Sequence, residues 1–287
     1  MSRNTFVAGF LGVCVAIAVV SFALHRLSPP ALPRGPSSPP AAWPDYSANG
    51  PGFLTPVTAD GELIAYGYKL VTETFALIGP EAPDAARRFA GNNLACKNCH
   101  LDAGTQRAGV PLVGVAKTYP KFSARSDRVI SLAERIDECM TRSMNGRKLP
   151  DNSREMSAYL AYLSFIGEPA AVTTEPALAA ALPGDATRGM QVFERVCAAC
   201  HQPDGLGKRW GAPADARGYR FPPLWGPDSF NDGAGMDHFQ RAVGFIHRNM
   251  PRGTDPAHPQ VTLQEAWDAA ALLQSKPRPH YEPTRPF

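Results

Sequence analysis

Apolar residues recur at helical spacing in several separate stretches of the chain. The clearest stretch covers residues 60–78, where one face carries Leu63, Gly67, Leu70, Val71, Thr74 and Ile78 at a period of 3.6 residues. Similar patterns predict further helices at about 84–90, 126–144, 153–165, 186–196, 236–250 and 262–275. The last of these starts with a capping box, Thr262-Leu-Gln-Glu265, which satisfies free amide donors. The pattern as a whole predicts an all-α protein.

The second half of the chain repeats the plan of the first half. Pro111-Leu-Val-Gly114 corresponds to Pro223-Leu-Trp-Gly226, and each is followed by a loop and a closing helix. Such self-similarity indicates an internal repeat. The length of 287 residues suits two domains that each bury a core.

Four of the six cysteines lie in two copies of the pattern C-x-x-C-H, the attachment signature of a c-type haem. The copies are Cys96-Lys-Asn-Cys99-His100 and Cys197-Ala-Ala-Cys200-His201. In each copy the two thiols form thioethers to the haem, and the histidine ligates the iron. A disulfide pair or a zinc site is the alternative, but the usual zinc-ligand spacings are missing. The motifs therefore predict two covalently bound haem c groups in two tandem cytochrome c domains.

The predicted domain organisation follows from these motifs and from the composition between them. Residues 1–27 form a signal peptide or membrane anchor, and residues 28–59 form a Pro-rich linker. The first cytochrome c domain covers residues 60–168 and the second covers residues 185–277. Residues 169–184 are a linker between them, and residues 278–287 are a proline-rich tail.

The ends and the charge of the chain indicate where it works and what it meets. The apolar run from Thr5 to Leu24 and the need to attach haem predict export to the periplasm, with anchoring to the inner membrane left open. Cys14 reads as a plain apolar residue of that run. A net charge of +3 without a basic cluster excludes nucleic acid as a partner and suits a small anion or an acidic redox protein.

Each haem iron needs a sixth ligand, and the two domains offer different candidates. In the second domain Met250 follows His201 by 49 residues and is preferred to Met236 and His247. In the first domain Met144 follows His100 by 44 residues, a comparable place. Cys139, Met140 and Met156 are the other candidates there. Spacing alone leaves open a methionine ligand with Cys139 as an inert buried thiol.

Arginine residues surround Cys139 in the sequence. Arg135, Cys139 and Arg142 fall at i, i+4 and i+7 of the predicted helix, with Arg125 just before it and Arg128 in its first turn. Guanidinium groups beside a thiol lower its pKa and favour the thiolate that ligates metal. They also bind small oxyanions through charge-assisted hydrogen bonds. The alternative is a solvated helix face that pairs with Asp127, Glu134, Asp137 and Glu138.

The sequence around these residues resembles the thiosulfate dehydrogenase family of periplasmic dihaem cytochromes c. The resemblance covers residues 60–275 and is carried by the stretches 91–105 (GNNLACKNCHLDAGT), 134–146 (ERIDECMTRSMNG), 221–226 (FPPLWG) and 229–236 (SFNDGAGM). It implies His100 and Cys139 as the axial ligands of an active-site haem, and His201 and Met250 as those of the second. It also implies that Arg125 and Arg135 bind substrate.

The activity that the resemblance implies is the oxidation of two thiosulfate ions to tetrathionate, a reaction that can also run in reverse. Electrons would pass through the second haem to a soluble or membrane-bound cytochrome c or another acceptor. Cys139 would either leave the iron and bond transiently to a thiosulfate sulfur or only tune the haem. Some family members carry a lysine ligand beside the distal methionine; Asn249 stands there in this chain, so no ligand switch is expected.

Two other functions remain as alternatives. A non-catalytic dihaem electron-transfer cytochrome is expected if Met144 ligates the first haem. A SoxA-like sulfur-carrier cytochrome that works with a partner subunit is the other.

Overall fold

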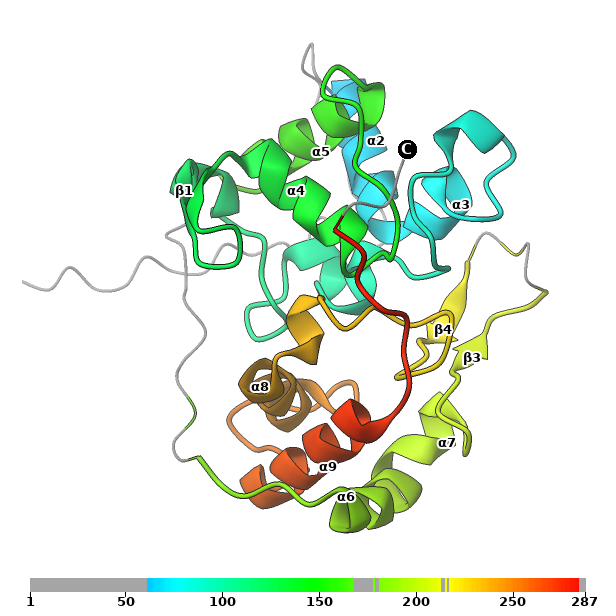
Figure 1. Ribbon diagram of the computed structural model, residues 1–287, viewed down its shortest axis with the longest axis vertical. Helices are drawn as coiled ribbons and strands as arrows, with labels where there is room; N and C mark the ends of the chain where they lie inside the picture. The colour runs from blue at the N-terminus through cyan, green and yellow to red at the C-terminus, as the bar shows by residue number, and fades with distance from the viewer. Residues whose placement is uncertain (1–60, 168–177, 179–180, 213–214, 216, 284–287) are drawn as a thin grey trace, which may run out of the picture. The chain divides into compact units, whose positions relative to one another are not determined.

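The computed structural model describes residues 61–167, 178, 181–212, 215 and 217–283 (Figure 1). The predicted signal or anchor at 1–27, the linker at 28–59 and most of the linker at 169–184 lie outside these ranges. So do Cys14 and the last residues of the predicted tail. Within the described part, no helix combines the length and the apolar character that crossing a bilayer requires.

The first half of the described chain is built from four helices. α2 (Gly61–Thr72) continues after a bend into α3 (Thr74–Ile78), and α4 (Leu132–Thr141) and α5 (Arg154–Phe165) follow later. Short 3-10 turns cover Ala85–Arg87, Cys96–Asn98, Asp102–Gly104 and Val115–Thr118. A small antiparallel hairpin of β1 (Lys121–Ser123) and β2 (Arg128–Ile130) precedes α4.

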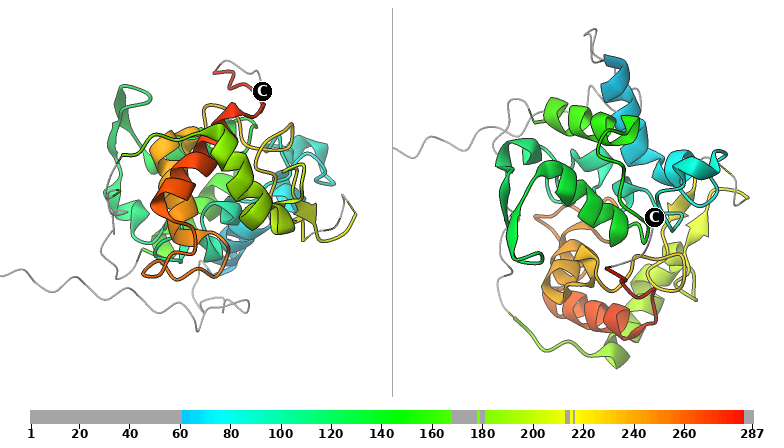
Figure 2. Two further views of the ribbon diagram at one scale, coloured as in Figure 1. Left: turned by 90° about the horizontal axis from the view of Figure 1, so that it is seen from below. Right: turned by 45° about the horizontal axis from the view of Figure 1, so that its top comes forward.

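The second half has a similar set of elements. α6 (Ala186–Val192) runs through a π-helical segment (Phe193–Cys197) into α7 (Ala198–His201). The hairpin of β3 (Lys208–Arg209) and β4 (Tyr219–Phe221) follows, then a 3-10 turn at Gly235–Asp237. α8 (Phe239–Asn249) and α9 (Leu263–Ser275) complete it, and α9 packs against both α6 and α8 (Figures 1 and 2).

The two halves share one packing device, a close crossing between the first and the last helix of each. A Cβ atom at Gly67 of α2 would lie 2.1 Å from the Ala158 carbonyl oxygen of α5. A Cβ atom at Gly189 of α6 would lie 2.1 Å from the Asp268 carbonyl oxygen of α9. Any other residue at either position would push the helices apart. This shared crossing supports the internal repeat that the sequence predicts.

The all-α prediction is confirmed, with the two short hairpins as its exceptions. The helix expected over 126–144 was wrong at its start, because residues 121–130 form the first hairpin and Asp127 has a positive φ of 49°. α4 begins only after Ser131, whose side chain and that of Glu134 form a capping box. The helix expected over 84–90 is reduced to a single 3-10 turn.

Hydrogen bonds join the two halves around the end of α4. The Asn92 side chain donates to the carbonyl oxygens of Ser143 (3.0 Å) and Ser229 (3.1 Å). The Asn231 side chain donates to the Thr141 carbonyl oxygen at 2.9 Å. These contacts fix the loop of residues 229–236 against the first domain, and both asparagines come from stretches that carry the family resemblance.

Candidate functional site

A cavity of about 270 Å³ lies in the first domain and contains the residues of its C-x-x-C-H motif. Cys96, Cys99 and His100 line one part of it, and Cys139 and Arg135 also line it. Most of the remaining lining is apolar: Val71, Leu94, Ala95, Val110, Pro111, Leu112, Val115, Leu132, Ile136, Met140, Met144, Leu163, Phe230 and Met236. An apolar cavity with two thiols and a histidine fits a covalently attached haem.

Each motif histidine is oriented by a backbone carbonyl. His100 Nδ1 donates to the Val110 carbonyl oxygen at 2.7 Å, and His201 Nδ1 donates to the Pro222 carbonyl oxygen at 2.8 Å. A carbonyl only accepts, so Nδ1 carries the proton and Nε2 is free to ligate iron. In both halves this carbonyl directly precedes the Pro-Leu-x-Gly sequence. The repeated sequence therefore serves to hold the proximal ligand.

The motif thiols have the chemistry that thioether formation needs. Burial raises the pKa of Cys96, and it raises the pKa of Cys99 to about 12. In the second motif burial raises the pKa of Cys197 to about 11. The five cysteines of the described part are free thiols, as covalent haem attachment requires. The four motif thiols are therefore available for thioether bonds to haem.

Cys139 has the opposite character. Burial alone would raise its pKa, but the charge of Arg135 and a hydrogen bond from His100 outweigh that effect and lower the pKa to about 7. The structure brings His100 and Cys139 together as lining residues of one cavity. Met144 also lines this cavity and is buried in the core.

Lys121 and Arg135 both line this cavity, and the positive charge that acts most strongly on Cys139 is that of Arg135. Its guanidinium forms an ion pair with Glu138 at 3.3 Å and a hydrogen bond with Tyr119, which also lines the cavity. The charge of Cys139 is the largest influence that raises the pKa of Arg135. Thiol and guanidinium therefore stabilise each other's charged forms. Arg128, by contrast, lies on β2 and pairs with Glu134 at 2.6 Å, the surface pairing that was the alternative for these arginines.

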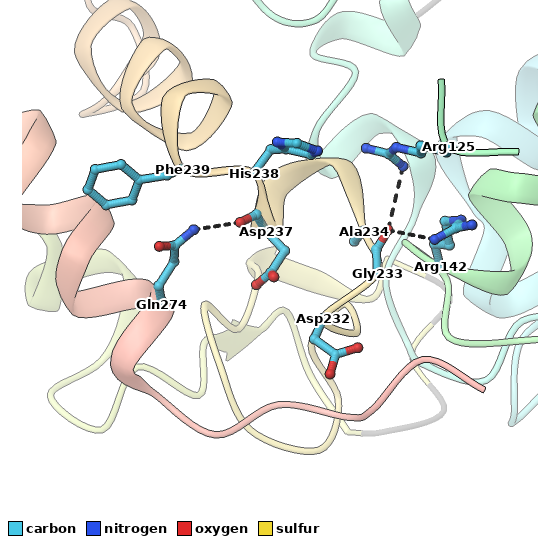
Figure 3. A pocket seen from close by; sticks show the side chains of 9 residues that line it. All are labelled: Arg125, Arg142, Asp232, Gly233, Ala234, Asp237, His238, Phe239 and Gln274. Atoms are coloured by element: carbon cyan, nitrogen blue, oxygen red, sulfur yellow. Dashed lines mark hydrogen bonds between the residues drawn. The ribbon is translucent and has the colours of Figure 1, made fainter. Parts of the chain in front are cut away.

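Arg125 and Arg142 do not line the haem cavity but a neighbouring one of about 490 Å³ (Figure 3). Arg135 and Cys139 line the haem cavity, whereas Arg142, the C-cap of α4, lines the second cavity instead. Arg125 and Arg135 still interact electrostatically. Burial and the charges of Arg135, Arg241 and Arg142 lower the pKa of Arg125. The two predicted substrate-binding arginines therefore lie in adjacent cavities.

Several lining residues escaped the sequence analysis. Tyr119 and Ser143 line the haem cavity, and Phe230 and Met236 reach it from the second half of the chain. Met236 had been considered as a ligand of the other haem. For Phe230 and Met236 the available signal was the stretch 229–236, which carries the family resemblance but contains no recognisable haem-binding motif.

The second motif has a different neighbourhood. His201 is 9% exposed, and burial lowers its pKa, which keeps the imidazole neutral for iron. Met250 is the C-cap of α8 and packs against the second-domain core. The rival His247 donates through Nδ1 to the Val261 carbonyl oxygen at 2.8 Å. Asn249 is buried and donates to the Ala108 carbonyl oxygen of the first domain at 2.8 Å. Ligation by Met250 stays a prediction.

Family models match both halves of the chain. Residues 86–169 match the model described as SoxA/TsdA, cytochrome c domain. Residues 184–273 match the model described as cytochrome C oxidase, cbb3-type, subunit III. The prediction of two tandem cytochrome c domains is confirmed. The chain accordingly carries two covalently bound haem c groups.

Relatives cover most of the chain. The thiosulfate dehydrogenase of Allochromatium vinosum is 39% identical over 242 residues, which are 80% of this chain and 84% of that protein. The thiosulfate dehydrogenase of Stutzerimonas stutzeri is 35% identical over 237 residues, 78% of this chain and 70% of that protein. A solved structure of thiosulfate dehydrogenase (TsdBA) from Marichromatium purpuratum aligns with a TM-score of 0.66 at 30% identity. It covers 83% of this chain, which spans about half of that longer chain (51%). The chain belongs to the thiosulfate dehydrogenase family.

Proposed function

We propose that this protein oxidises two thiosulfate ions to tetrathionate at its first haem and passes the electrons through its second haem to an external acceptor. The observation that carries the proposal is the presence of Cys139, His100 and Arg135 in the lining of one cavity. A thiol whose pKa is lowered to about 7 beside an arginine fits a sulfur-handling, anion-binding site. A plain electron carrier needs neither group.

The proposed reaction balances without protons. Each thiosulfate loses one electron, a bond forms between the two terminal sulfur atoms, and two electrons leave. The haem, when bound, supplies the one-electron acceptor at this site. The task of the protein is to bring two dianions together against their repulsion in a site of low polarity. Arg135 does this for the haem cavity, because a guanidinium binds a sulfonate oxygen by charge-assisted hydrogen bonds.

Two roles for Cys139 fit its position. In the first, the Cys139 thiolate and one thiosulfate would form a transient S–S bond with loss of two electrons, one to each haem, and the second thiosulfate would then displace the thiolate to give tetrathionate. In the second, the Cys139 thiolate would only ligate the haem iron and would lower its reduction potential by stabilising the ferric form. The same groups serve tetrathionate reduction, so the direction in the cell depends on the potential of the acceptor.

We place the protein in the periplasm, with a cytochrome c or another redox protein as the acceptor. The paired haem motifs and the apolar N-terminal run support export. The net charge of +3 suits an acidic acceptor. N-terminal sequencing of the exported protein decides between cleavage of residues 1–27 and their retention as an anchor of the inner membrane.

The test adds thiosulfate to the oxidised holoprotein and follows haem reduction optically. The wild type should be reduced, and Cys139→Ala should be slower by about 100-fold or more, the usual cost of removing a central catalytic group. Met144→Leu is the matched control, because Met144 lines the same cavity. It should keep a rate close to that of the wild type.

Each other outcome contradicts a part of the proposal. A wild type that thiosulfate does not reduce is no thiosulfate dehydrogenase. Equal rates for wild type and Cys139→Ala remove Cys139 from the reaction. Loss of the low-spin haem signal in Met144→Leu, with no thiolate-ligated haem in the electron paramagnetic resonance spectrum of the wild type, would indicate an electron-transfer cytochrome.

A further inference from the structure

The cavity beside the haem site is lined by arginines that have few partners (Figure 3). Arg125 and Arg142 both point their guanidinium groups at the carbonyl oxygen of Gly233, with N–O distances of 3.5 and 3.4 Å. Two cations thus share one neutral acceptor through long hydrogen bonds. Such an arrangement leaves both charges uncompensated and is favourable for an anion that bridges them.

Buried guanidinium nitrogens without a partner lie at the same place. Nη2 of Arg125 and Nε of Arg142 are buried and have no hydrogen-bond acceptor among the described residues. Buried donors are normally satisfied, so each exception needs an explanation. A bound oxyanion, with several acceptor oxygens, would satisfy both.

Arg241, an exposed residue of α8 that does not itself line the cavity, places a third positive charge beside it. A Cβ atom placed on Gly235 would lie 2.9 Å from Nη1 of Arg241 and 3.8 Å from Nη2 of Arg125. Gly235 therefore has both guanidinium groups beside it. Burial and the charge of Arg135, followed by the charges of Arg241 and Arg142, lower the pKa of Arg125, as expected for cations that lie close together.

The acidic residues of this cavity are engaged elsewhere. Asp232 accepts from Nδ1 of His280 and from the backbone amide of Tyr281, each at 2.7 Å. Asp237 pairs with Arg278 at 3.3 Å. Within the described ranges, neither carboxylate forms an ion pair with Arg125 or Arg142, which line the cavity, or with Arg241 beside it.

The C-terminal segment covers one face of the Arg142 guanidinium and leaves its edge open to a ligand. The guanidinium carbon of Arg142 lies 4.1 Å from the ring centroid of Tyr281. This stacking covers one face of the guanidinium and leaves its N–H groups, which lie in its plane, available for oxygen atoms.

The two cavities meet along the end of α4 and the loop of residues 229–236. Arg142 lines the second cavity, and the next residue, Ser143, lines the haem cavity. Ala234 lines the second cavity, and Met236 lines the haem cavity. Anions in the two cavities would therefore be neighbours.

We propose that Arg125, Arg142 and Arg241 form a second anion site, which holds the sulfonate group of one thiosulfate while Arg135 holds the other. In the product, the same two sites hold the two sulfonate ends of tetrathionate. This inference rests on the proposed function and adds Arg142 and Arg241 to the substrate-binding residues. It gives each of the two dianions its own set of cations, as a coupling of two like charges requires.

The test measures the binding of tetrathionate to the fully oxidised holoprotein by isothermal titration calorimetry. Tetrathionate is the oxidised product, so it does not react with ferric haem, and the measurement does not depend on turnover. Arg142→Gln and Arg241→Gln should each weaken binding by about tenfold, the usual effect of losing a charge-assisted hydrogen bond. Arg217→Gln is the matched control, because Arg217 is exposed and interacts with Asp215 and the ring of Trp210, neither of which lines either cavity.

The steady-state kinetics provide the second readout. Arg142→Gln and Arg241→Gln should raise the KM for thiosulfate about tenfold with a smaller change of kcat. Haem spectra and thermal melting check that each variant is folded. Arg241 has no contact with the C-terminal segment among those described, so its variant separates loss of the site from loss of that segment's anchoring.

The inference is overturned if tetrathionate binds Arg142→Gln and Arg241→Gln as tightly as Arg217→Gln. It is also overturned if the oxidised wild type oxidises thiosulfate but does not bind tetrathionate. A wild type that binds tetrathionate through these arginines but is not reduced by thiosulfate contradicts the proposed function alone.

Discussion

The two haem sites are alike on the side of the proximal histidine and differ on the other side. In both, Nδ1 of the histidine donates to the carbonyl that precedes a Pro-Leu-x-Gly sequence. On the distal side, the first site has Cys139 with a pKa lowered to about 7, next to Arg135. In the second domain Met250, the predicted distal ligand, is the C-cap of α8 and packs against an apolar core.

This difference shows which part of a repeated domain carries its chemistry. The proximal half holds the cofactor, and the repeat keeps its backbone contacts. The distal half is free to diverge, and in the first domain it gains a thiol, arginines and two side chains from the second domain, Phe230 and Met236. The first site is therefore complete only when the second domain packs against it.

The largest expected effect comes from removing one arginine at each site. Arg135→Gln should slow the reduction of the haems by thiosulfate about 100-fold, because the haem cavity loses the guanidinium that acts on Cys139, although Lys121 still lines it. Arg195→Gln is the corresponding change at the second motif, because the charge of Arg195 acts on Cys197. The Arg195 side chain, however, is exposed and paired with Glu265. The rate of Arg195→Gln should stay within about twofold of the wild type. Stopped-flow absorbance measures the rate of haem reduction in both variants. Equal rate losses would contradict the proposal that only the first haem site binds substrate.

A smaller effect is expected from exchanging one methionine at each site. Met250→Leu should lower the reduction potential of the second haem by on the order of 100 mV, because a thioether ligand favours ferrous iron. Met144→Leu should leave both potentials unchanged and reduce stability by about 1 kcal/mol, since Met144 is only a core side chain if Cys139 is the ligand. Potentiometric titration separates the two cases. A shifted first-haem potential in Met144→Leu would contradict ligation by Cys139.

The proximal half of the site was predictable from the sequence because it is local. The C-x-x-C-H motifs, the capping box at Thr262 and the apolar helix faces each depend on residues close in the chain. Cys139 was found through its spacing from Arg135 and through the resemblance. The structure places both in the cavity of the first haem.

The remainder of the site depends on contacts between distant segments. Arg142, the C-cap of α4, lines the second cavity together with residues from the second half of the chain. Its guanidinium stacks on Tyr281 of the C-terminal segment. The hairpin before α4 was read as helix because its short strands carry no clear alternation. No local pattern in residues 229–236 indicates that they contribute to the cavity of the other domain.

The smallest expected effect compares two tyrosines that each donate to a carboxylate. The Tyr219 hydroxyl donates to Asp228 at 2.7 Å, and Asp228 also accepts from the Asn93 amide of the first domain at 2.8 Å. The Tyr66 hydroxyl donates to Glu155 at 2.9 Å, a contact within the first domain. Replacing either by Phe should reduce stability by about 1 kcal/mol at pH 7. Of the two variants, Tyr219→Phe alone should slow electron transfer between the haems. The Tyr219 hydroxyl orients Asp228, which is hydrogen-bonded to Asn93 of the first domain, whereas the Tyr66 contact lies within one domain.

The pH dependence of stability gives this last comparison a second measurement. Burial, followed by the hydrogen bond to the carboxylate, raises the pKa of both Tyr219 and Tyr66 from 10.0 to about 12. The folded state then holds the phenolic proton more tightly than the unfolded state does, so the contribution is fully present below pH 10 and is lost as the pH rises to about 12. Both side chains are partly exposed, so solvent screening limits each contribution to about 1 kcal/mol. Urea unfolding at pH 9 to 12 should show a shallower loss of stability in each variant than in the wild type, and an unchanged slope would contradict the assigned hydrogen bonds.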